Sequence, residues 1–183
     1  LGELATGDHD YKAVVIDTVS CAERLMHEHV CNRDYNGDWE RGFLAYHRGY
    51  EASMADWRQF LSALDKLRDE KNVAVVMLEH TQVRPYKNPL GEDYDRFVPA
   101  LHAKSWDLLH RYSDAVLFAD YYVQVDESGN RPKGKGGKVR IMRTEYSPAW
   151  DCKNRFGMDP EIEMGDSGAE AWANLRDAMK GEK

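Results

Sequence analysis

The pentad Lys153-Asn154-Arg155-Phe156-Gly157 places two cations one residue apart, just before a glycine. On an extended segment the side chains of Lys153 and Arg155 point to the same face, whereas Asn154 points to the other. Gly157 then allows the chain to leave by a turn. Two cations on one face, beside a turn, suit a phosphate on a neighbouring subunit. A solvated basic turn has the same composition, so the pentad alone leaves both interpretations open.

The acid at the end of the first apolar run is a second candidate site. The run Ala13-Val14-Val15-Ile16 is typical of a strand buried on both faces of a parallel sheet, and Asp17 and Thr18 follow it. A carboxylate at the end of such a strand matches the Walker B pattern, in which it holds Mg²⁺ beside nucleotide phosphates. An acid at this position is equally typical of the cap of the next helix.

Polar residues also follow the second apolar run, 73–78. His80 and Gln82 stand just beyond it, where a polar side chain can sense a terminal phosphate and pass its presence to the next loop. A metal-ligand or general-base role for His80 is the alternative. His27 and His29 occur in a helical pattern without partners, and we expect both on the surface.

A polar stretch from Arg84 to Pro99 is expected to be a long loop that contains three prolines. Its cations and the rings of Tyr86, Tyr94 and Phe97 suit single-stranded DNA, because cations pair with phosphates and bases stack on aromatic rings. Acids in the same stretch make an ordinary solvated loop equally compatible.

A second basic segment, 131–143, has six Lys or Arg and no acid. It resembles a phosphate-binding loop only superficially, because Val139 follows Lys138 where Ser or Thr is needed. We expect a hairpin tip, whose cations would contact a polyanion backbone. The candidate DNA contacts of the chain are Arg84, Lys87, Arg96, Lys104, Lys133, Lys135 and Lys138.

The elements that position these residues follow from the spacing of apolar side chains. The expected strands are 13–16, 73–78 and 115–119, and the expected helices are 19–30, 53–70, 101–112 and 167–179. This alternation predicts a parallel α/β architecture with right-handed connections. Residues 121–125 and 138–144 alternate as in a β-hairpin, and 32–50 is typical of an insertion of mixed structure.

The composition fits one globular domain of 183 residues with 42% hydrophobic and 31% charged residues. A net charge of −7 argues against a uniformly basic nucleic-acid binder but allows a local basic groove. The sequence has no long apolar run, no signal-peptide pattern and three cysteines without metal-ligand spacing, so we expect a cytoplasmic protein without a membrane partner. Residues 1–4 are typical of the last turn of a helix whose beginning lies upstream.

The order of these motifs resembles the RecA-type P-loop ATPase core after its first third, over roughly Asp10 to Pro160. The final pentad is similar to the motif of the same sequence in bacterial RadA and to the Lys-x-Arg finger of DnaB-type helicases. The runs Asp10–Thr18 and Pro148–Arg155 resemble phage-encoded RecA-like ATP-binding proteins associated with single-strand annealing and recombination.

The resemblance implies one partial RecA-like domain over residues 1–183, an α/β fold with a mainly parallel sheet flanked by helices and a C-terminal β-hairpin. It implies ATP and Mg²⁺ as cofactors, with Asp17 on the Mg²⁺ side. It further implies single-stranded DNA and other copies of the chain, in a ring or filament, as partners. The implied nucleotide contacts are Asp17, Thr18, Lys153 and Arg155, and the implied catalytic residues are Asp17, His80, Gln82, Lys153 and Arg155.

The sequence departs from this family in lacking a Walker A loop and an upstream catalytic glutamate. One interpretation is that both lie upstream of Leu1 and that the whole protein is a DNA-dependent ATPase. The other is a degenerate relative, a non-enzymatic module that binds and anneals single-stranded DNA.

Overall fold

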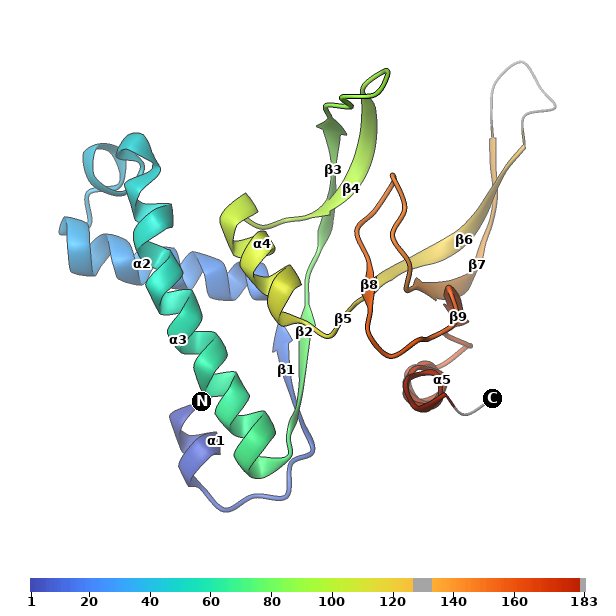
Figure 1. Cartoon of the computed structure of the whole chain (residues 1–183), viewed down its shortest axis with the longest axis horizontal. Helices are drawn as coiled ribbons and strands as arrows, with labels where there is room; N and C mark the ends of the chain where they lie inside the picture. The colour runs from blue at the N-terminus through green and yellow to red at the C-terminus, as the bar shows by residue number, and fades with distance from the viewer. Residues whose placement is uncertain (127–132, 182–183) are drawn as a thin grey trace. The chain divides into compact units, whose positions relative to one another are not determined.

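The computed structural model describes residues 1–126 and 133–181, and their contacts divide the chain into two compact units (Figure 1). Unit 1 comprises Leu1–Gln82 and Pro99–Leu109, and unit 2 comprises Val83–Val98 and His110–Lys183. Both helices and strands are present, and the sheets are small. The single domain expected from the sequence remains a prediction.

Unit 1 is built on two parallel strands, β1 (Ala13–Asp17) and β2 (Ala74–Leu78), which lie side by side in Figure 1. The register pairs the first residue of each strand and also Asp17 with Leu78, so both carboxyl ends lie at one edge. The expected parallel strand-helix-strand unit is therefore confirmed. Its connection consists of four helical segments, α2 (Val19–Tyr35), η1 (Trp39–Phe43), η2 (Ala45–His47) and α3 (Arg48–Lys71).

The expectation that β1 is buried on both faces is wrong for the described structure. Burial alternates along the strand, and Val15 in its middle is 55% exposed. Within residues 1–126 and 133–181, no third strand pairs with β1 or β2. An apolar, β-branched run indicates that a strand tolerates burial on both faces, but neighbouring elements decide whether it is covered.

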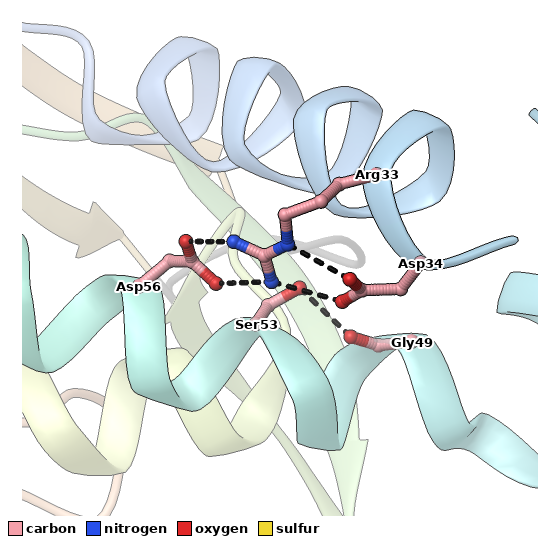
Figure 2. A network of polar contacts seen from close by, with 5 residues as sticks. All are labelled: Arg33, Asp34, Gly49, Ser53 and Asp56. Atoms are coloured by element: carbon pink, nitrogen blue, oxygen red, sulfur yellow. Dashed lines mark hydrogen bonds and ion pairs between the residues drawn. The ribbon is translucent and has the colours of Figure 1, made fainter. Parts of the chain in front are cut away.

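Arg33 near the end of α2 ties this helix to α3, as Figure 2 shows. Its guanidinium donates to Asp34 through Nε at 2.8 Å and to Asp56 on α3 through Nη1 at 2.7 Å. The same guanidinium holds the pKa of the Asp34 carboxyl below its usual value. In the same view Ser53 donates to the Gly49 carbonyl at 2.8 Å, one turn earlier on α3. Asp56 accepts from both Nη atoms of Arg33, at 2.7 and 3.0 Å, and this planar fork orients the two helices more closely than a single hydrogen bond would.

His27 on α2 is buried at 9% exposure, which corrects the expectation of a surface histidine. Its ring lies 5.3 Å from that of Phe43 and 5.2 Å from that of Tyr50. Burial lowers the pKa of the His27 imidazole and His102 lowers it further, whereas the Glu23 carboxylate opposes them. Among the described residues its Nε2 has no hydrogen-bond partner. The exposed His29, two residues on, matches the expectation.

The stretch expected as a long loop is instead a pair of hydrogen-bonded strands, β3 (Thr81–Tyr86) and β4 (Tyr94–Pro99). Residues 87–93 are too few for a parallel crossover, so the two strands form a hairpin. Its prolines are compatible with this, because each strand of a two-stranded sheet is an edge strand. The helix α4 (Ala103–Tyr112) follows.

Unit 2 contains the β-hairpin expected from the sequence, formed by β6 (Phe118–Asp126) and β7 (Lys133–Arg143), with β9 (Glu161–Glu163) against β7. The expected strand 115–119 is divided between β6 and the short β5 (Ala115–Val116).

β5 pairs in antiparallel orientation with β8 (Lys153–Asn154), not with the strands of unit 1. The described sheets are therefore small, and β1–β2 is the parallel pair among them, in place of one mainly parallel sheet. The remaining helices are α1 (Gly2–Thr6) and α5 (Gly168–Lys180).

We expect His27 to make the protein less stable in mild acid. Because the folded state lowers its pKa below the unfolded value of about 6.5, the unfolded chain binds a proton first as the pH falls. The free energy of unfolding should fall from about pH 6.5 downward, by at most about 1.4 kcal/mol per pH unit for this group. Urea unfolding at pH 7.5 and 5.5 should show a smaller pH effect in His27→Phe. The matched His29→Phe should behave as wild type, and equal pH effects in both variants would contradict the assignment.

Candidate functional site

Asp17 lies at the carboxyl edge of the parallel pair, directly before α2. Its carboxylate is exposed and makes no hydrogen bond or ion pair within residues 1–126 and 133–181. Thr18 occupies the N-cap position of α2, and its hydroxyl shares a hydrogen bond of 3.0 Å with the Ser20 hydroxyl. Asp17 is therefore not used as a cap, which was the alternative role open from the sequence. A free carboxylate beside a helix N-terminus remains available for a ligand.

Glu79 is the residue that sequence reasoning missed. It follows β2, one position beyond the Asp17–Leu78 pair. One carboxylate oxygen accepts the backbone N–H of Ser20 at 2.5 Å, and the other accepts the N–H of His80 at 2.9 Å. The carboxylate thus joins the N-terminus of α2 to the end of β2, where negative charge is favourable. The signal for it was an acid directly after the second apolar run, as Asp17 directly follows the first apolar run.

His80 and Gln82 lie at the same end of β2, as expected, but they make different kinds of hydrogen bond. His80 is exposed, and its carbonyl accepts the Ala100 N–H at 2.9 Å. The Gln82 side chain donates to the Pro99 carbonyl at 3.3 Å. Both contacts connect the beginning of β3 to the residues that precede α4.

The chemistry of this edge fits Mg²⁺ only if oxygens from elsewhere contribute. Among the residues described, no three His, Cys, Asp or Glu side chains gather closely enough to hold a metal ion. Mg²⁺ in phosphate sites commonly takes one or two carboxylates, phosphate oxygens and water. Asp17 is the available carboxylate, since both oxygens of Glu79 already accept backbone N–H groups.

Lys153 and Arg155 do project toward the same part of the chain, but that part is residues 110–114 of unit 2. The Lys153 ammonium donates to the carbonyls of His110 at 2.9 Å and Arg111 at 3.1 Å. These are carbonyls of the last turn of α4, so Lys153 caps the C-terminus of this helix. Desolvation lowers the pKa of the Lys153 ammonium and the nearby Arg155 lowers it further, whereas Asp114 raises it.

Arg155 pairs with Asp114 at 2.9 Å, and both side chains are more than half exposed. Asn154 points away from these cations and bonds to the Met158 carbonyl at 2.9 Å. Gly157 adopts a φ of +68°, which is the turn expected from the sequence. Lys153 and Arg155 thus contact one part of the chain and Asn154 another, as expected. The contacts of the two cations with α4 and Asp114 were not expected. Those contacts depend on residues some forty positions earlier.

Arg96, a candidate DNA contact, is buried at 9% exposure on β4. It donates to Asp151 at 2.7 Å, and its guanidinium lies over the rings of Tyr86 at 5.2 Å and Tyr146 at 5.7 Å. These contacts fix the hairpin against the segment that precedes β8. Arg96 therefore stabilises the unit, and its charge is already compensated within it.

The other candidate DNA contacts differ in whether their charge is already paired with an acid. Lys87 pairs with Asp93 at 2.5 Å, and Lys104 pairs with Glu51. Arg84 and Lys138 are exposed. Lys133 and Lys135 belong to β7, but their side chains lie outside the described part of the structure, as do residues 131 and 132 of the basic segment.

The carboxylate of Asp17 lies at the carboxyl edge of the parallel pair, where α/β proteins bind their ligands. A family model described as an AAA domain matches residues 1–156. The match covers most of the chain, which belongs to this family of P-loop AAA-type ATPases. Membership implies an ATP-binding, nucleotide-related function.

Neither a search of curated proteins nor a search of solved structures returned a significant match. Among the described residues, no helix combines the length and the apolar character needed to cross a membrane.

We expect Lys153→Met to weaken the C-terminus of α4. The substitution removes two hydrogen bonds to carbonyls and a favourable charge at the negative end of the helix dipole, worth about 0.5–1.5 kcal/mol together. Urea unfolding measures the loss, and hydrogen exchange should show faster exchange in residues 108–114. The exposed Lys138→Met serves as the matched control. If Lys153→Met unfolds as wild type does, the capping role is wrong.

Proposed function

We propose that this chain belongs to a RecA-like, ATP-binding core that acts on DNA in recombination or single-strand annealing. The observation that carries the nucleotide part is Asp17, a free, exposed carboxylate at the carboxyl edge of β1–β2 in a member of the AAA domain family. In this proposal Asp17 holds Mg²⁺ on the phosphate side of ATP, and the ion neutralises phosphate charge. Thr18 lies beside it at the start of α2.

Glu79 has a different role in this site. Because its carboxylate accepts N–H groups from both Ser20 and His80, it fixes the strand end and the helix start relative to each other. Asp17 then presents its carboxylate from a rigid edge. His80 and Gln82, which are hydrogen-bonded to Ala100 and Pro99 just before α4, sense the terminal phosphate in this proposal.

The two cations of the pentad act on the nucleotide of a neighbouring copy in this proposal, with ATP bound between subunits. Arg155 is better suited to this than Lys153. An exposed ion pair such as Arg155–Asp114 is worth only about 0–1 kcal/mol, so exchanging Asp114 for a phosphate costs little. Lys153 would leave two helix carbonyls when it moves.

Two variants of the full-length protein test the nucleotide site. Asp17→Asn should remove most of the gain in ATP affinity that Mg²⁺ gives, because the neutral amide is a poor ligand for a hard cation. Arg155→Ala should lower DNA-stimulated hydrolysis by about 10³–10⁵-fold, the usual effect of an arginine finger, with ATP affinity nearly unchanged. Fluorescent-nucleotide titration and phosphate release measure the two effects.

Asp8→Asn is the matched control for Asp17→Asn, since Asp8 is an exposed acid of the same unit that precedes β1. Mg²⁺-dependent affinity that survives in Asp17→Asn would remove the metal role. Unchanged turnover in Arg155→Ala would remove the finger role and leave the ion pair with Asp114 as its function.

The second candidate function is a non-enzymatic module that binds and anneals single-stranded DNA. The exposed cations Arg84 and Lys138, on the two hairpins of unit 2, favour it. Neither makes a contact to an acid within the described residues, and both are therefore available to phosphates.

We expect oligonucleotide binding without nucleotide to weaken steeply with salt. Neutralising Lys133, Lys135 and Lys138 to Gln should lower the slope of log K against log salt by up to about 2, since each single-strand phosphate contact contributes about 0.7. Fluorescence anisotropy over a salt series measures the slope. Lys12→Gln is the control, and an unchanged slope in the triple variant would exclude the hairpin from DNA binding.

A further inference from the structure

Unit 2 contains a polar hollow beside the pentad. Its volume is about 480 Å³, within the roughly 300–1,000 Å³ typical of pockets for small ligands. Two segments supply its walls: residues 144–146, which follow β7, and residues 152–158, which include the pentad. Most of the side chains that line it are polar, namely Thr144, Glu145, Tyr146, Lys153 and Asn154.

Hydrogen bonds hold both walls of the hollow in place. The Asn154 amide donates to the Thr144 hydroxyl at 3.4 Å and to the Met158 carbonyl at 2.9 Å, so it ties one wall to the other. The Trp150 indole donates to the Glu145 carbonyl at 3.2 Å and thereby fixes the backbone of the first wall. The hollow is thus formed before a ligand enters, which lowers the entropic cost of binding.

Most polar groups at the hollow already have partners within unit 2. The Thr144 hydroxyl donates to the Asp159 carbonyl at 2.9 Å, and the Lys153 ammonium donates to the carbonyls at the end of α4. The Cys152 thiol donates to the Arg143 carbonyl at 3.2 Å. Burial raises the pKa of this thiol to about 11, so it is not a nucleophile at neutral pH. These groups shape the hollow and leave the contacts with a ligand to others.

Two neighbouring side chains at the hollow are available for a ligand. Glu145 is exposed, and its carboxylate makes no hydrogen bond or ion pair within residues 1–126 and 133–181. Tyr146 is 61% exposed, and its hydroxyl has no hydrogen-bond partner in the same part of the chain. The Arg96 guanidinium lies over the Tyr146 ring at 5.7 Å and steadies it, while the exposed part of the ring can stack on a ligand.

A free carboxylate beside an exposed ring selects a flat ligand with hydrogen-bond donors on its edge. A carboxylate only accepts, and its two oxygens suit two adjacent N–H groups. Among the DNA bases, guanine alone has two adjacent donors, N1–H and the 2-amino group, on its Watson–Crick edge. Adenine and cytosine place an acceptor nitrogen beside their amino group, and thymine has a carbonyl on each side of its N–H. In a single strand this edge is free, and bases stack on aromatic side chains.

We propose that the hollow beside the pentad binds an unpaired guanine of single-stranded DNA, which stacks on Tyr146 and donates its N1–H and 2-amino group to the Glu145 carboxylate. The proposal rests on the DNA-binding part of the proposed function and adds a base preference to it. Because the charge of Glu145 repels phosphates, Glu145 contributes selectivity, and the cations of unit 2 contribute affinity.

Fluorescence anisotropy of the full-length protein with labelled oligothymidylates that differ only in the central base tests this preference. Wild type should bind the oligonucleotide with guanine at least about fivefold more tightly than the one with adenine, the usual discrimination by a bidentate contact. Hypoxanthine, which lacks the 2-amino group, should give an affinity between the two. Glu145→Gln should abolish the preference for guanine and favour adenine, because an amide both donates and accepts.

Matched variants separate base recognition from a general loss of binding. Glu163→Gln, at an exposed acid of β9 in the same unit, should keep the preference for guanine. Tyr146→Ala should weaken binding of the guanine oligonucleotide about tenfold, which is within the usual effect of one stacked base, whereas Tyr146→Phe keeps the ring and should bind as wild type. A preference for guanine that survives in Glu145→Gln, or equal binding of all three oligonucleotides by wild type, overturns the proposal.

If no oligonucleotide binds, calorimetric titration with dGMP, in excess ATP to fill the nucleotide site, distinguishes the two failures. Binding of dGMP to wild type and not to Glu145→Gln keeps the hollow as a guanine site and overturns only the DNA-binding part of the proposed function. Absence of dGMP binding overturns both. Oligonucleotides that bind wild type without any base preference overturn the guanine site alone.

Discussion

The carboxylate of Glu79 is the contact on which the candidate site depends. By accepting the N–H groups of Ser20 and His80, it fixes the N-terminus of α2 at the end of β2. This contact joins segments 59 residues apart and leaves Asp17, on the neighbouring strand, with a carboxylate free for a ligand. Removing Glu79 would leave the first turn of α2 without this acceptor and would release the strand end that carries His80.

A second glutamate makes the same kind of contact at the next helix. Glu23 on α2 is buried, and both of its oxygens accept the His102 N–H just before α4, at 3.1 and 3.2 Å. The other end of α4 is capped by Lys153. Acids at the N-termini of α2 and α4 and a cation at the C-terminus of α4 thus complement the dipoles of these helices. The pentad is therefore part of the structure of unit 2, whatever else it does.

Several features were predictable from local pattern. The parallel pair, the helices α2, α3, α4 and α5 and the hairpin β6–β7 follow apolar spacings that the sequence shows directly. The hairpin β3–β4 was missed because its prolines and charges resemble those of a loop, although a two-stranded sheet tolerates both. His27 was misplaced because burial of a histidine among Phe43 and Tyr50 depends on a turn that periodicity does not describe.

The sequence by itself determined which residues can carry chemistry: an acid after an apolar strand, polar residues after the next strand and two cations on one face of a pentad. These features depend on residue type and on spacings of a few positions. Only the tertiary structure decided which of them are free. Among the residues that the structure describes, Glu79, Arg96 and Lys153 are engaged by partners far along the chain, whereas the Asp17 carboxylate has none. Hydrogen bonds and ion pairs between distant segments form only once the chain has folded, and they leave no local pattern in the sequence.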